Sequence, residues 1–339
     1  MVRVVVVGGG VSGVGTALAL LKRQPQCHLT ILAQDFSPAT TGDGAAGLWE
    51  PYLTGETPYD KVGQWSLGTW KLFSEWWRSG LARKMGVNLL QGAIVGEEDC
   101  RIEPWHHLAF YCKDLTQEQC MQINPKYRSG FKLASMTGEV SKFLPVLLEE
   151  VKSLGGRLEV RRVSSLQEAA AEADLVINCA GLGSRDLVPD PTVYPCRGQV
   201  IRVRAPWIGE FLCDIATELS TYIIANTDTV VLGGTHQNHD WRLDVDPNDS
   251  QTIWDNCTTL MPSLKRAEVV QEWVGLRPCR KEGVRLEADE ILLDSRTVPV
   301  VHNYGHGGCG VTLFWGCGQE AAAIASDLIY KYHGPPSRL

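Results

Sequence analysis

The sequence predicts an α/β fold in which a mostly antiparallel sheet interrupts a parallel one. Residues 2–32 have strand, helix and strand character in turn, which is the pattern of a parallel βαβ unit. Strand-like runs around a short alanine-rich helix return at 158–179, where we expect the first sheet to resume. The runs at 198–203, 222–224 and 229–232 are separated by turn residues, which indicates an antiparallel sheet in the inserted part.

Each element follows from the spacing of apolar residues. Val2–Val7 is a β-branched run without alternation, typical of a strand buried on both faces, and glycines end it. Further strands of the first sheet are expected at 27–32, 158–163 and 175–179. Helical spacing predicts helices at 11–22, 64–80, 140–154 and 318–332, a partly helical segment at 263–274, and a loop at 38–57.

Composition limits the classes of function. With 339 residues, two domains are the natural expectation, and 32 Lys+Arg against 39 Asp+Glu give a net charge of -7. We expect no nucleic acid partner, because a polyanion needs a basic surface. No apolar stretch approaches the ~20 residues of a membrane span, so we expect no membrane partner. The 11 cysteines include no C-x-x-C pair, which favours a reducing compartment and argues against a metal site.

A glycine-rich loop follows the first strand. Residues 8–13 (GGGVSG) fit G-x-G-x-x-G between a strand and a helix, the context that a dinucleotide-binding loop needs. Gly8 allows the tight turn, Gly10 lets the backbone approach a pyrophosphate, and Gly13 lets the helix pack closely on the strand. NAD and FAD proteins share this motif. Asp35, after the second strand, is the candidate for binding ribose hydroxyls, and an exposed turn aspartate is the alternative.

Five further blocks resemble one known family. They are Thr40 to Tyr52, Asn178 to Gly181, Arg197 to Gln199, Gly275 to Pro278 and His302 to Gly308. In these blocks, which run in the family's order along nearly the whole chain, the sequence resembles the D-amino-acid oxidase and D-aspartate oxidase family. The resemblance implies an FAD-binding domain of Rossmann type interleaved with a substrate domain that carries a mostly antiparallel β-sheet. It places the FAD-binding domain at 1–50, 140–190 and 290–339, and the substrate-binding domain at 51–139 and 191–289.

The resemblance also implies how FAD is bound. The pyrophosphate would lie on the loop at 8–13, and backbone N–H groups of the turn at 307–312 would reach the carbonyl edge of the flavin ring. The implied cofactor contacts are Gly8, Gly10, Val11, Ser12, Gly13, Thr40, Thr41, Gly47, Leu48, Val163, Cys179, Gly181, Gly307, Gly308, Gly310, Val311 and Thr312. The family often has Asp followed by a basic residue where this chain has Gln34-Asp35, which leaves the ribose contact of Asp35 open.

Four positions are implied to bind the substrate. Arg277 would pair with the substrate carboxylate, because a guanidinium fork matches a carboxylate in two places. The Tyr222 hydroxyl would reach the same carboxylate, Tyr52 would line the pocket, and the backbone carbonyl near Gly308 would hold the amine. Taken without the family, such an arginine is usually a surface or ion-pair residue, and a strand tyrosine is a packed aromatic.

The implied reaction is the oxidation of a D-amino acid. The α-hydrogen would pass as hydride to the flavin, and oxygen would then accept the electrons and form hydrogen peroxide. The imino acid would hydrolyse to a 2-oxo acid and ammonia. The partners are therefore a small D-amino acid and oxygen. No catalytic base is required, and the resemblance gives His302 and His306 a structural role near the flavin turn.

The preferred substrate side chain depends on a few positions. Tyr52 favours neutral D-amino acids, because enzymes of acidic substrates tend to carry His there. The short segment before Tyr222 instead resembles that of the D-aspartate oxidases. Cys213 and His236 stand where the acidic-substrate enzymes use arginines, so we favour neutral D-amino acids. D-aspartate or D-glutamate, bound through His236 or Arg242, is the alternative.

The chain ends in Ser337-Arg338-Leu339, a variant of the Ser-Lys-Leu peroxisomal address. It predicts a peroxisomal import receptor as partner and a location in the peroxisome matrix, and a random tail is the alternative. A homodimer is the assembly that we consider. Three other functions use the same glycine loop: a nicotinamide-dependent dehydrogenase, a catalytically silent dinucleotide-binding regulator, and an oxidase of glycine or sarcosine.

Overall fold

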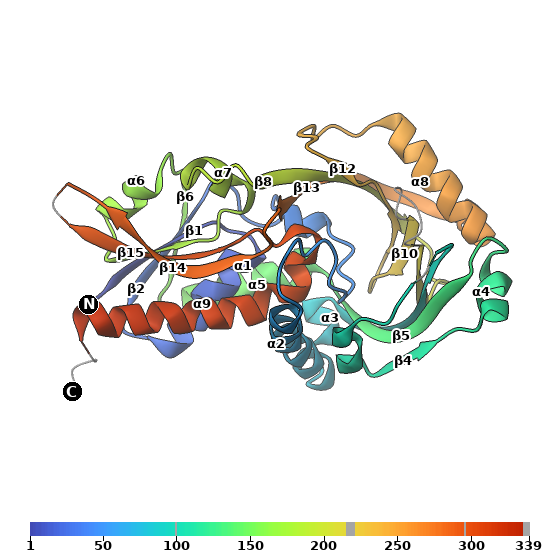
Figure 1. The fold of residues 1–339 in the computed structure, drawn as a ribbon, viewed down its shortest axis with the longest axis horizontal. Helices are drawn as coiled ribbons and strands as arrows, with labels where there is room; N and C mark the ends of the chain where they lie inside the picture. Colours follow the sequence, from blue (N-terminus) through green and yellow to red (C-terminus); the bar gives the residue numbers. More distant parts are fainter. Residues whose placement is uncertain (99, 215–220, 295, 335–339) are drawn as a thin grey trace.

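A computed structural model describes residues 1–98, 100–214, 221–294 and 296–334. The predicted address at Ser337-Arg338-Leu339 lies outside the described residues. Two sheets lie one after the other along the long axis of the molecule (Figure 1). The N-terminus and the end of helix α9 (Gly310–His333) lie at the outer end of the first sheet. The predicted α/β fold with an inserted second sheet is confirmed.

The first sheet has six strands in the order β14-β15-β7-β1-β2-β6. Their bounds are β1 Arg3–Val7, β2 His28–Ala33, β6 Arg157–Val160, β7 Leu175–Asn178, β14 Arg285–Leu292 and β15 Thr297–Tyr304. Neighbouring strands are parallel except for β14, which runs antiparallel to β15. The parallel strands expected near residues 2–7, 27–32, 158–163 and 175–179 are confirmed.

Both faces of the first sheet are buried. Val4 and Val6 belong to the apolar core shared with α1, α5 and α9, whereas Val5 and Val7 pack with residues of α6. This explains why the first strand is an uninterrupted apolar run. The helices are α1 Val11–Arg23, α2 Tyr59–Arg78, α3 Ala82–Met85, α4 Gln117–Ile123, α5 Val140–Ser153, α6 Leu166–Ala171, α7 Ser184–Leu187, α8 Pro247–Leu260 and α9.

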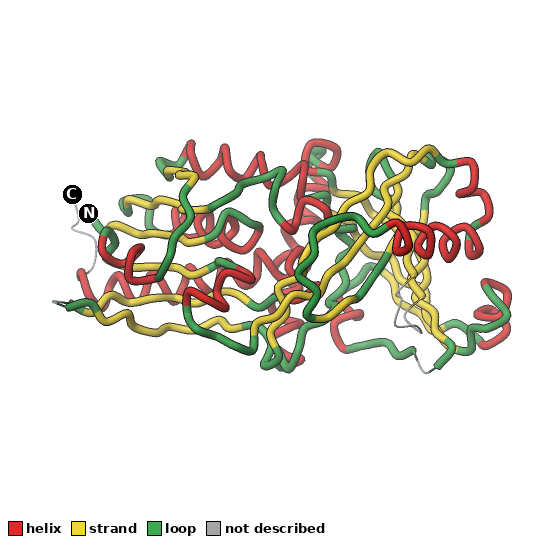
Figure 2. Tube along the Cα trace, turned by 90° about the horizontal axis from the view of Figure 1, so that it is seen from above, coloured by secondary structure: helices red, strands yellow, loops and turns green. Residues whose placement is uncertain are grey.

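The second sheet has nine strands and is mostly antiparallel. Its order is β12-β8-β11-β10-β9-β3-β5-β4, and β13 pairs with β8 outside this path. The bounds are β3 Val87–Gly96, β4 Tyr111–Asp114, β5 Ser129–Gly138, β8 Val193–Arg204, β9 Glu210–Asp214, β10 Thr221–Ala225, β11 Val230–Gly233, β12 Gln237–Asn238 and β13 Glu268–Arg280. Among the described strands of this second sheet, only β3 and β9 pair in parallel. Seen from above, strands fill both halves of the elongated molecule (Figure 2).

Three predicted boundaries differ from the structure. The segment expected to be partly helical at 263–274 has a short 3₁₀ helix at Pro262–Arg266, and strand β13 then begins at Glu268. Pairing along β8 holds β13 extended, and such tertiary pairing outweighs a weak local helical pattern. Helix α2 begins at Tyr59 rather than at 64, and α9 begins at Gly310 rather than at 318. Each of these added first turns contains one glycine, Gly63 or Gly310, and glycine lowers helix propensity.

A buried carboxylate connects the two sheets. Asp190 accepts hydrogen bonds from Arg280 Nε of β13 and from the Tyr304 hydroxyl of β15, both at 2.8 Å. Burial alone would raise the pKa of Asp190, but hydrogen bonds from Arg280, Thr192 and Tyr304 outweigh it and hold the pKa well below its usual range. Asp190 therefore stays ionised and ties the sheets together where they meet.

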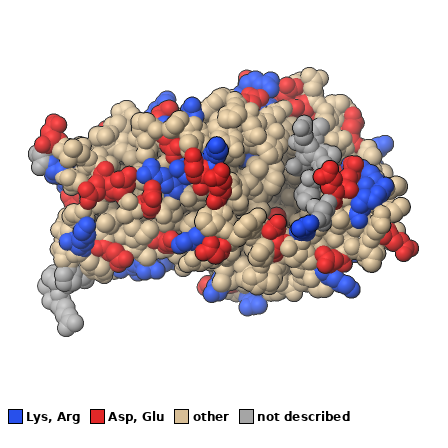
Figure 3. Space-filling view, viewed as in Figure 1, with Lys and Arg blue, Asp and Glu red and all other residues tan. Residues whose placement is uncertain are grey.

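The surface carries both signs of charge. On the face drawn in Figure 3, Lys and Arg side chains alternate with Asp and Glu. No helix in the described part of the chain is long and apolar enough to span a membrane. All 11 cysteines lie in described segments and are free thiols.

Candidate active site

One large cavity joins the two sheets. It has a volume of about 1300 Å³ and is lined by residues of the glycine loop, of the turn at 306–312 and of the second sheet. Strands β1, β7 and β15 all end at this cavity, with Gly8, Cys179 and Tyr304 among its lining residues. Ligands bind at the carboxyl ends of parallel strands in such sheets, so the cavity is the candidate active site.

Almost every residue predicted from the sequence lines this cavity. The predicted lining residues are Gly8, Gly10, Val11, Ser12, Asp35, Thr40, Thr41, Gly47, Leu48, Tyr52, Val163, Cys179, Gly181, Tyr222, Arg277, Gly307, Gly308, Gly310, Val311 and Thr312. Gly13 and His236 are predicted site residues that do not line it. The structure thus brings together segments from the whole length of the chain, while the binding role of each residue stays a prediction.

The glycine loop has room for a ligand at only one of its three key glycines. A Cβ on Gly8, whose φ is +122°, would lie 2.3 Å from the Cys179 carbonyl oxygen, and one on Gly13 would lie 1.9 Å from the Gly8 oxygen. A Cβ on Gly10 would meet nothing within 4 Å. Gly10 also begins helix α1 without a side-chain cap, and the first turn of α1 has no acidic residue. The free N–H donors and open space at Gly10 therefore fit a pyrophosphate.

The adenosine end holds residues that the sequence analysis did not identify. Asp35 is exposed and lines the cavity next to Gln34. Arg161, Arg162 and Asp186 line the cavity in addition to the predicted residues. Arg161 and Arg162 lie in the loop after β6, and Asp186 lies in the four-residue helix α7. Segments as short as these carry no spacing signal.

The flavin-end turn is tightly fixed. A Cβ on Gly307, whose φ is +55°, would lie 2.0 Å from the Leu53 oxygen. The Thr312 hydroxyl accepts from the Glu50 N–H and donates to the Glu50 oxygen, both at 3.2 Å. The turn at 307–312 is therefore held against the loop that carries Tyr52, as close backbone approach requires.

Two histidines near this turn are buried and neutral. Burial lowers the pKa of His306 to about 4, and burial followed by the charge of Arg285 lowers that of His302 to about 4. His302 Nδ1 lies 3.3 Å from Asn178 Nδ2, and His306 Nδ1 lies 3.4 Å from Ser12 Oγ. Both are weak bases, which agrees with the structural role that we expected for them.

Glycines make room for the two side chains expected to bind the substrate carboxylate. A Cβ on Gly198 would lie 2.4 Å from Arg277 Nη1, and one on Gly233 would lie 2.1 Å from Tyr222 Cζ. Arg277 Nη1 donates to the Thr235 carbonyl oxygen at 3.1 Å. Burial raises the pKa of Tyr222, so its hydroxyl stays protonated and can donate.

His236 supports the pocket without lining it. Its Nδ1 lies 3.0 Å from the Tyr52 hydroxyl, and the two rings meet edge to face at 6.1 Å. Burial and then the charge of Arg277 lower the pKa of His236 below its usual value. The ring is therefore neutral at pH 7. Arg242, which the alternative of acidic substrates invoked, pairs with Asp240 and Asp246 and does not line the cavity.

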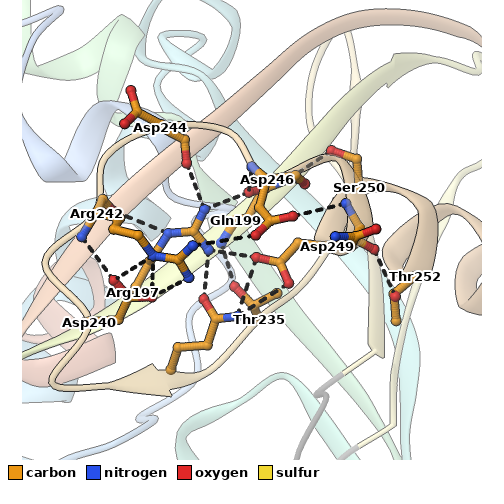
Figure 4. Close-up of polar contacts among 12 residues, drawn as sticks. Arg197, Gln199, Thr235, Asp240, Arg242, Asp244, Asp246, Asp249, Ser250 and Thr252 are labelled. Atoms are coloured by element: carbon orange, nitrogen blue, oxygen red, sulfur yellow. Dashed lines mark hydrogen bonds and ion pairs between the residues drawn. The ribbon is translucent and has the colours of Figure 1, made fainter.

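The buried side chain of Arg197 lies at the centre of a network of polar contacts (Figure 4). Arg197 is fully buried and donates to Asp249 Oδ2 at 2.7 Å and to Gln237 Oε1 at 2.6 Å. The neighbouring Gln199 N–H donates to the Thr235 hydroxyl at 2.9 Å. This network fixes the segment that presents the Thr235 carbonyl to Arg277, so it positions the guanidinium rather than binding a ligand.

Sequence reasoning missed an acid and a base in the same cavity. Glu50 and His106 both line it, and their side chains form a hydrogen-bonded pair. The two residues lie 56 positions apart in the chain, so no motif joins them. Among the described residues, no group of His, Cys, Asp and Glu side chains is arranged to hold a metal ion.

Comparisons with known proteins find similar proteins over nearly the whole chain. The protein family described as FAD dependent oxidoreductase matches residues 3–324. The D-aspartate oxidase of Homo sapiens is 37% identical over 335 residues, covering 98% of this chain and 97% of the human protein. The D-amino-acid oxidase of Rubrobacter xylanophilus is 38% identical over 326 residues, covering 95% of each chain. The fold resembles glycine oxidase from Geobacillus kaustophilus with a TM-score of 0.75 at 18% identity, over 98% of this chain and 95% of that one.

Proposed function

Because the chain belongs to the family of FAD-dependent oxidoreductases that includes the D-amino-acid oxidases, we propose that it oxidatively deaminates D-amino acids. One observation carries the proposal. A single cavity is lined by an open glycine loop, by a fixed glycine turn and by Arg277 with Tyr222. A nicotinamide-dependent dehydrogenase is no longer an alternative, because the family is FAD-dependent.

The residues of this chain orient the substrate. Arg277 pairs with the α-carboxylate through its guanidinium fork, and the Tyr222 hydroxyl donates a second hydrogen bond to it. The Gly308 carbonyl accepts from the amine. FAD, when bound, supplies hydride-accepting chemistry and passes two electrons to oxygen. Overall, a D-amino acid, oxygen and water give a 2-oxo acid, ammonia and hydrogen peroxide, and no side chain is needed as a general base.

Neutral side chains suit the pocket better than acidic ones. Cys213 lines the cavity and has no positive charge to offer. His236 is neutral at pH 7 and already bonded to Tyr52, and Arg242 points elsewhere. D-aspartate oxidation is the second candidate function, favoured by the 37% identity with the human D-aspartate oxidase.

Visible spectroscopy tests the proposed function. We expect the purified protein to be yellow, and its flavin band to bleach anaerobically with D-alanine, more slowly with D-aspartate, and not with L-alanine. Glycine serves as the control for a glycine oxidase. A protein that stays colourless after incubation with FAD, or that no D-amino acid bleaches, would contradict the proposal. Faster bleaching by D-aspartate than by D-alanine would make D-aspartate oxidation the favoured function and oxidation of neutral D-amino acids the second candidate.

We further propose that the protein is imported into the peroxisome matrix through Ser337-Arg338-Leu339. Support comes from the sequence alone, because the Ser-Lys-Leu address tolerates the conservative change to Arg. An oxidase that forms peroxide gains from lying beside catalase. A fluorescent reporter carrying this tripeptide at its C-terminus should collect in peroxisomes, and a diffuse reporter would contradict the proposal. A homodimer stays a prediction.

A further inference from the structure

The cavity extends beyond the carboxylate-binding side chains into a part with apolar walls. Tyr222 of β10 is paired across the sheet with Cys213 of β9, and Cys213 is paired in turn with Ile94 of β3. Cys213 and Ile94 line the cavity together with Phe131 and Trp105. This distal part of the cavity therefore begins beside Tyr222 and is walled by aliphatic and aromatic groups.

Acidic side chains line the cavity as well, and one of them, Glu50, pairs with His106. Glu50 lines the cavity, and its backbone is held by the Thr312 hydroxyl at the flavin turn. Both carboxylate oxygens lie 3.0 Å from His106 Nε2. Burial and then the charge of Glu50 raise the pKa of Cys213, so the field of this carboxylate reaches the residue beside Tyr222. Glu50 is therefore close to where a substrate side chain would lie.

The histidine holds this carboxylate without neutralising it. The backbone N–H of Glu103 donates to His106 Nδ1 at 2.7 Å, so Nδ1 is an acceptor and the proton sits on Nε2. The His106 ring is buried and packs against Phe131 with ring centroids 4.7 Å apart. A neutral Nε2–H donor leaves Glu50 with its full negative charge and with spare lone pairs.

Other charges in the cavity do not cancel Glu50. The arginines that line the cavity are Arg101, Arg161, Arg162 and Arg277. Arg277 serves the α-carboxylate, and Arg161 and Arg162 adjoin Val163 at the adenosine end. Arg101 is exposed, so water and salt screen its charge. Asp214 of β9, another acid that lines the cavity, is already paired with Lys126 at 2.8 Å.

We propose that Glu50, held by His106, makes the enzyme prefer D-amino acids whose side chain ends in an ammonium or guanidinium group. The inference rests on the proposed oxidase function. Methylene groups of such a side chain would lie against Ile94 and Phe131, and its cation would meet the Glu50 carboxylate. A substrate carboxylate at the same place would be repelled, which adds a second reason why D-aspartate is a poor substrate.

Steady-state kinetics with matched substrates test this preference. We expect kcat/KM for D-lysine to exceed that for D-norleucine, which has a similar shape without the charge, about 10-fold to 100-fold. Glu50→Gln should lower the D-lysine to D-norleucine ratio by the same factor and should raise the relative rate with D-glutamate. Glu103→Gln is the matched control, because it removes one negative charge from the same cavity and keeps the backbone N–H that orients His106.

Binding provides a readout that does not depend on turnover. 6-Aminohexanoate carries the carboxylate and terminal ammonium of lysine without an oxidisable α-amino group. Hexanoate has the same carboxylate and chain length without the terminal ammonium, so it is the matched control ligand. By calorimetry with the FAD-loaded protein, 6-aminohexanoate should bind at least 10-fold more tightly, and Glu50→Gln should abolish the difference.

The outcomes separate this inference from the proposed function. If no D-amino acid, including D-alanine, yields peroxide, the oxidase function is wrong. The affinities for 6-aminohexanoate and hexanoate would then still show whether Glu50 binds a terminal ammonium group. If D-alanine is oxidised while D-lysine is no better than D-norleucine, the inference is wrong and the function stands. If Glu50→Gln and Glu103→Gln lowered the D-lysine to D-norleucine ratio equally, the inference would also be wrong. The preference would then come from the overall charge of the cavity rather than from a contact with Glu50.

Discussion

Replacing Arg277 with lysine lowers kcat/KM for D-alanine about 100-fold or more. Loss of a buried charge-assisted hydrogen bond costs 2–5 kcal/mol, about 30-fold to several thousand-fold, and lysine keeps the charge but not the two-pronged geometry. The site is shaped for a guanidinium, because Gly198 clears space for it and the Thr235 carbonyl accepts from Nη1 at 3.1 Å. The main effect should appear in KM, since a carboxylate contact present in the bound substrate is weakened.

Arg280→Lys is the control for that variant. Arg280 lies three residues further along β13, is held by Asp190 at 2.8 Å and does not line the cavity. Arg280→Lys should have the same kcat/KM as the parent protein, and both variants should keep the yellow flavin spectrum. If Arg277→Lys had the same KM as the parent protein, the proposed binding of the substrate carboxylate by Arg277 would be wrong.

Local sequence signals predicted the N-terminal strand, helix and strand unit well. The run at 2–7, the loop at 8–13 and the helix after it form one continuous segment, and each carries its own periodicity. Strand β13 was misjudged at its start because its exposed first residues have no strand-like alternation, and only pairing with β8 makes them extended. A local sequence pattern is therefore sufficient for a unit whose elements are adjacent in the sequence. It fails for a strand whose extended conformation depends on pairing with a strand far away in the sequence.

The candidate site shows the same division. Arg277 and the glycine turn could be identified because they lie in motif blocks that resemble a family, and Tyr222 because it matches a single tyrosine position of that family. Glu50 is part of such a block, but its partner His106 lies in a 3₁₀ helix at Pro104–Leu108 with no signal of its own. The charge of His236 could not be judged either, because burial and the neighbouring Arg277 set its pKa.

The role of the Gly198 and Gly233 positions emerges only in three dimensions. Each lies under a side chain from a neighbouring strand, Arg277 or Tyr222. In the sequence Gly198 is a single glycine within a strand, and Gly233 ends a strand and is followed by Gly234. Such glycines suggest only that something approaches the backbone closely. The structure identifies what approaches, and it thereby connects two glycines on β8 and β11 to the substrate end of the cavity.

Two glycines of the nucleotide loop should separate cofactor binding from folding. We expect Gly10→Val to fold with a stability within about 0.5 kcal/mol of the parent, because a Cβ there meets nothing within 4 Å and φ is -80°. The new side chain would occupy the approach to the pyrophosphate and weaken FAD binding by about 1–3 kcal/mol, roughly 5-fold to 150-fold. Quenching of flavin fluorescence on titration of FAD with apoprotein measures this loss.

Gly13→Ala should have the opposite profile. Its Cβ would lie 1.9 Å from the Gly8 carbonyl oxygen. Because this oxygen belongs to the backbone and cannot rotate away as a side chain could, helix α1 must move away from β1. We expect a loss of about 3 kcal/mol or more in the free energy of unfolding, visible as a lower melting temperature of the apoprotein. If Gly10→Val melted as early as Gly13→Ala, or bound FAD like the parent, then Gly10 would be a structural turn residue. The open space above it would then not be the place where the dinucleotide meets the helix.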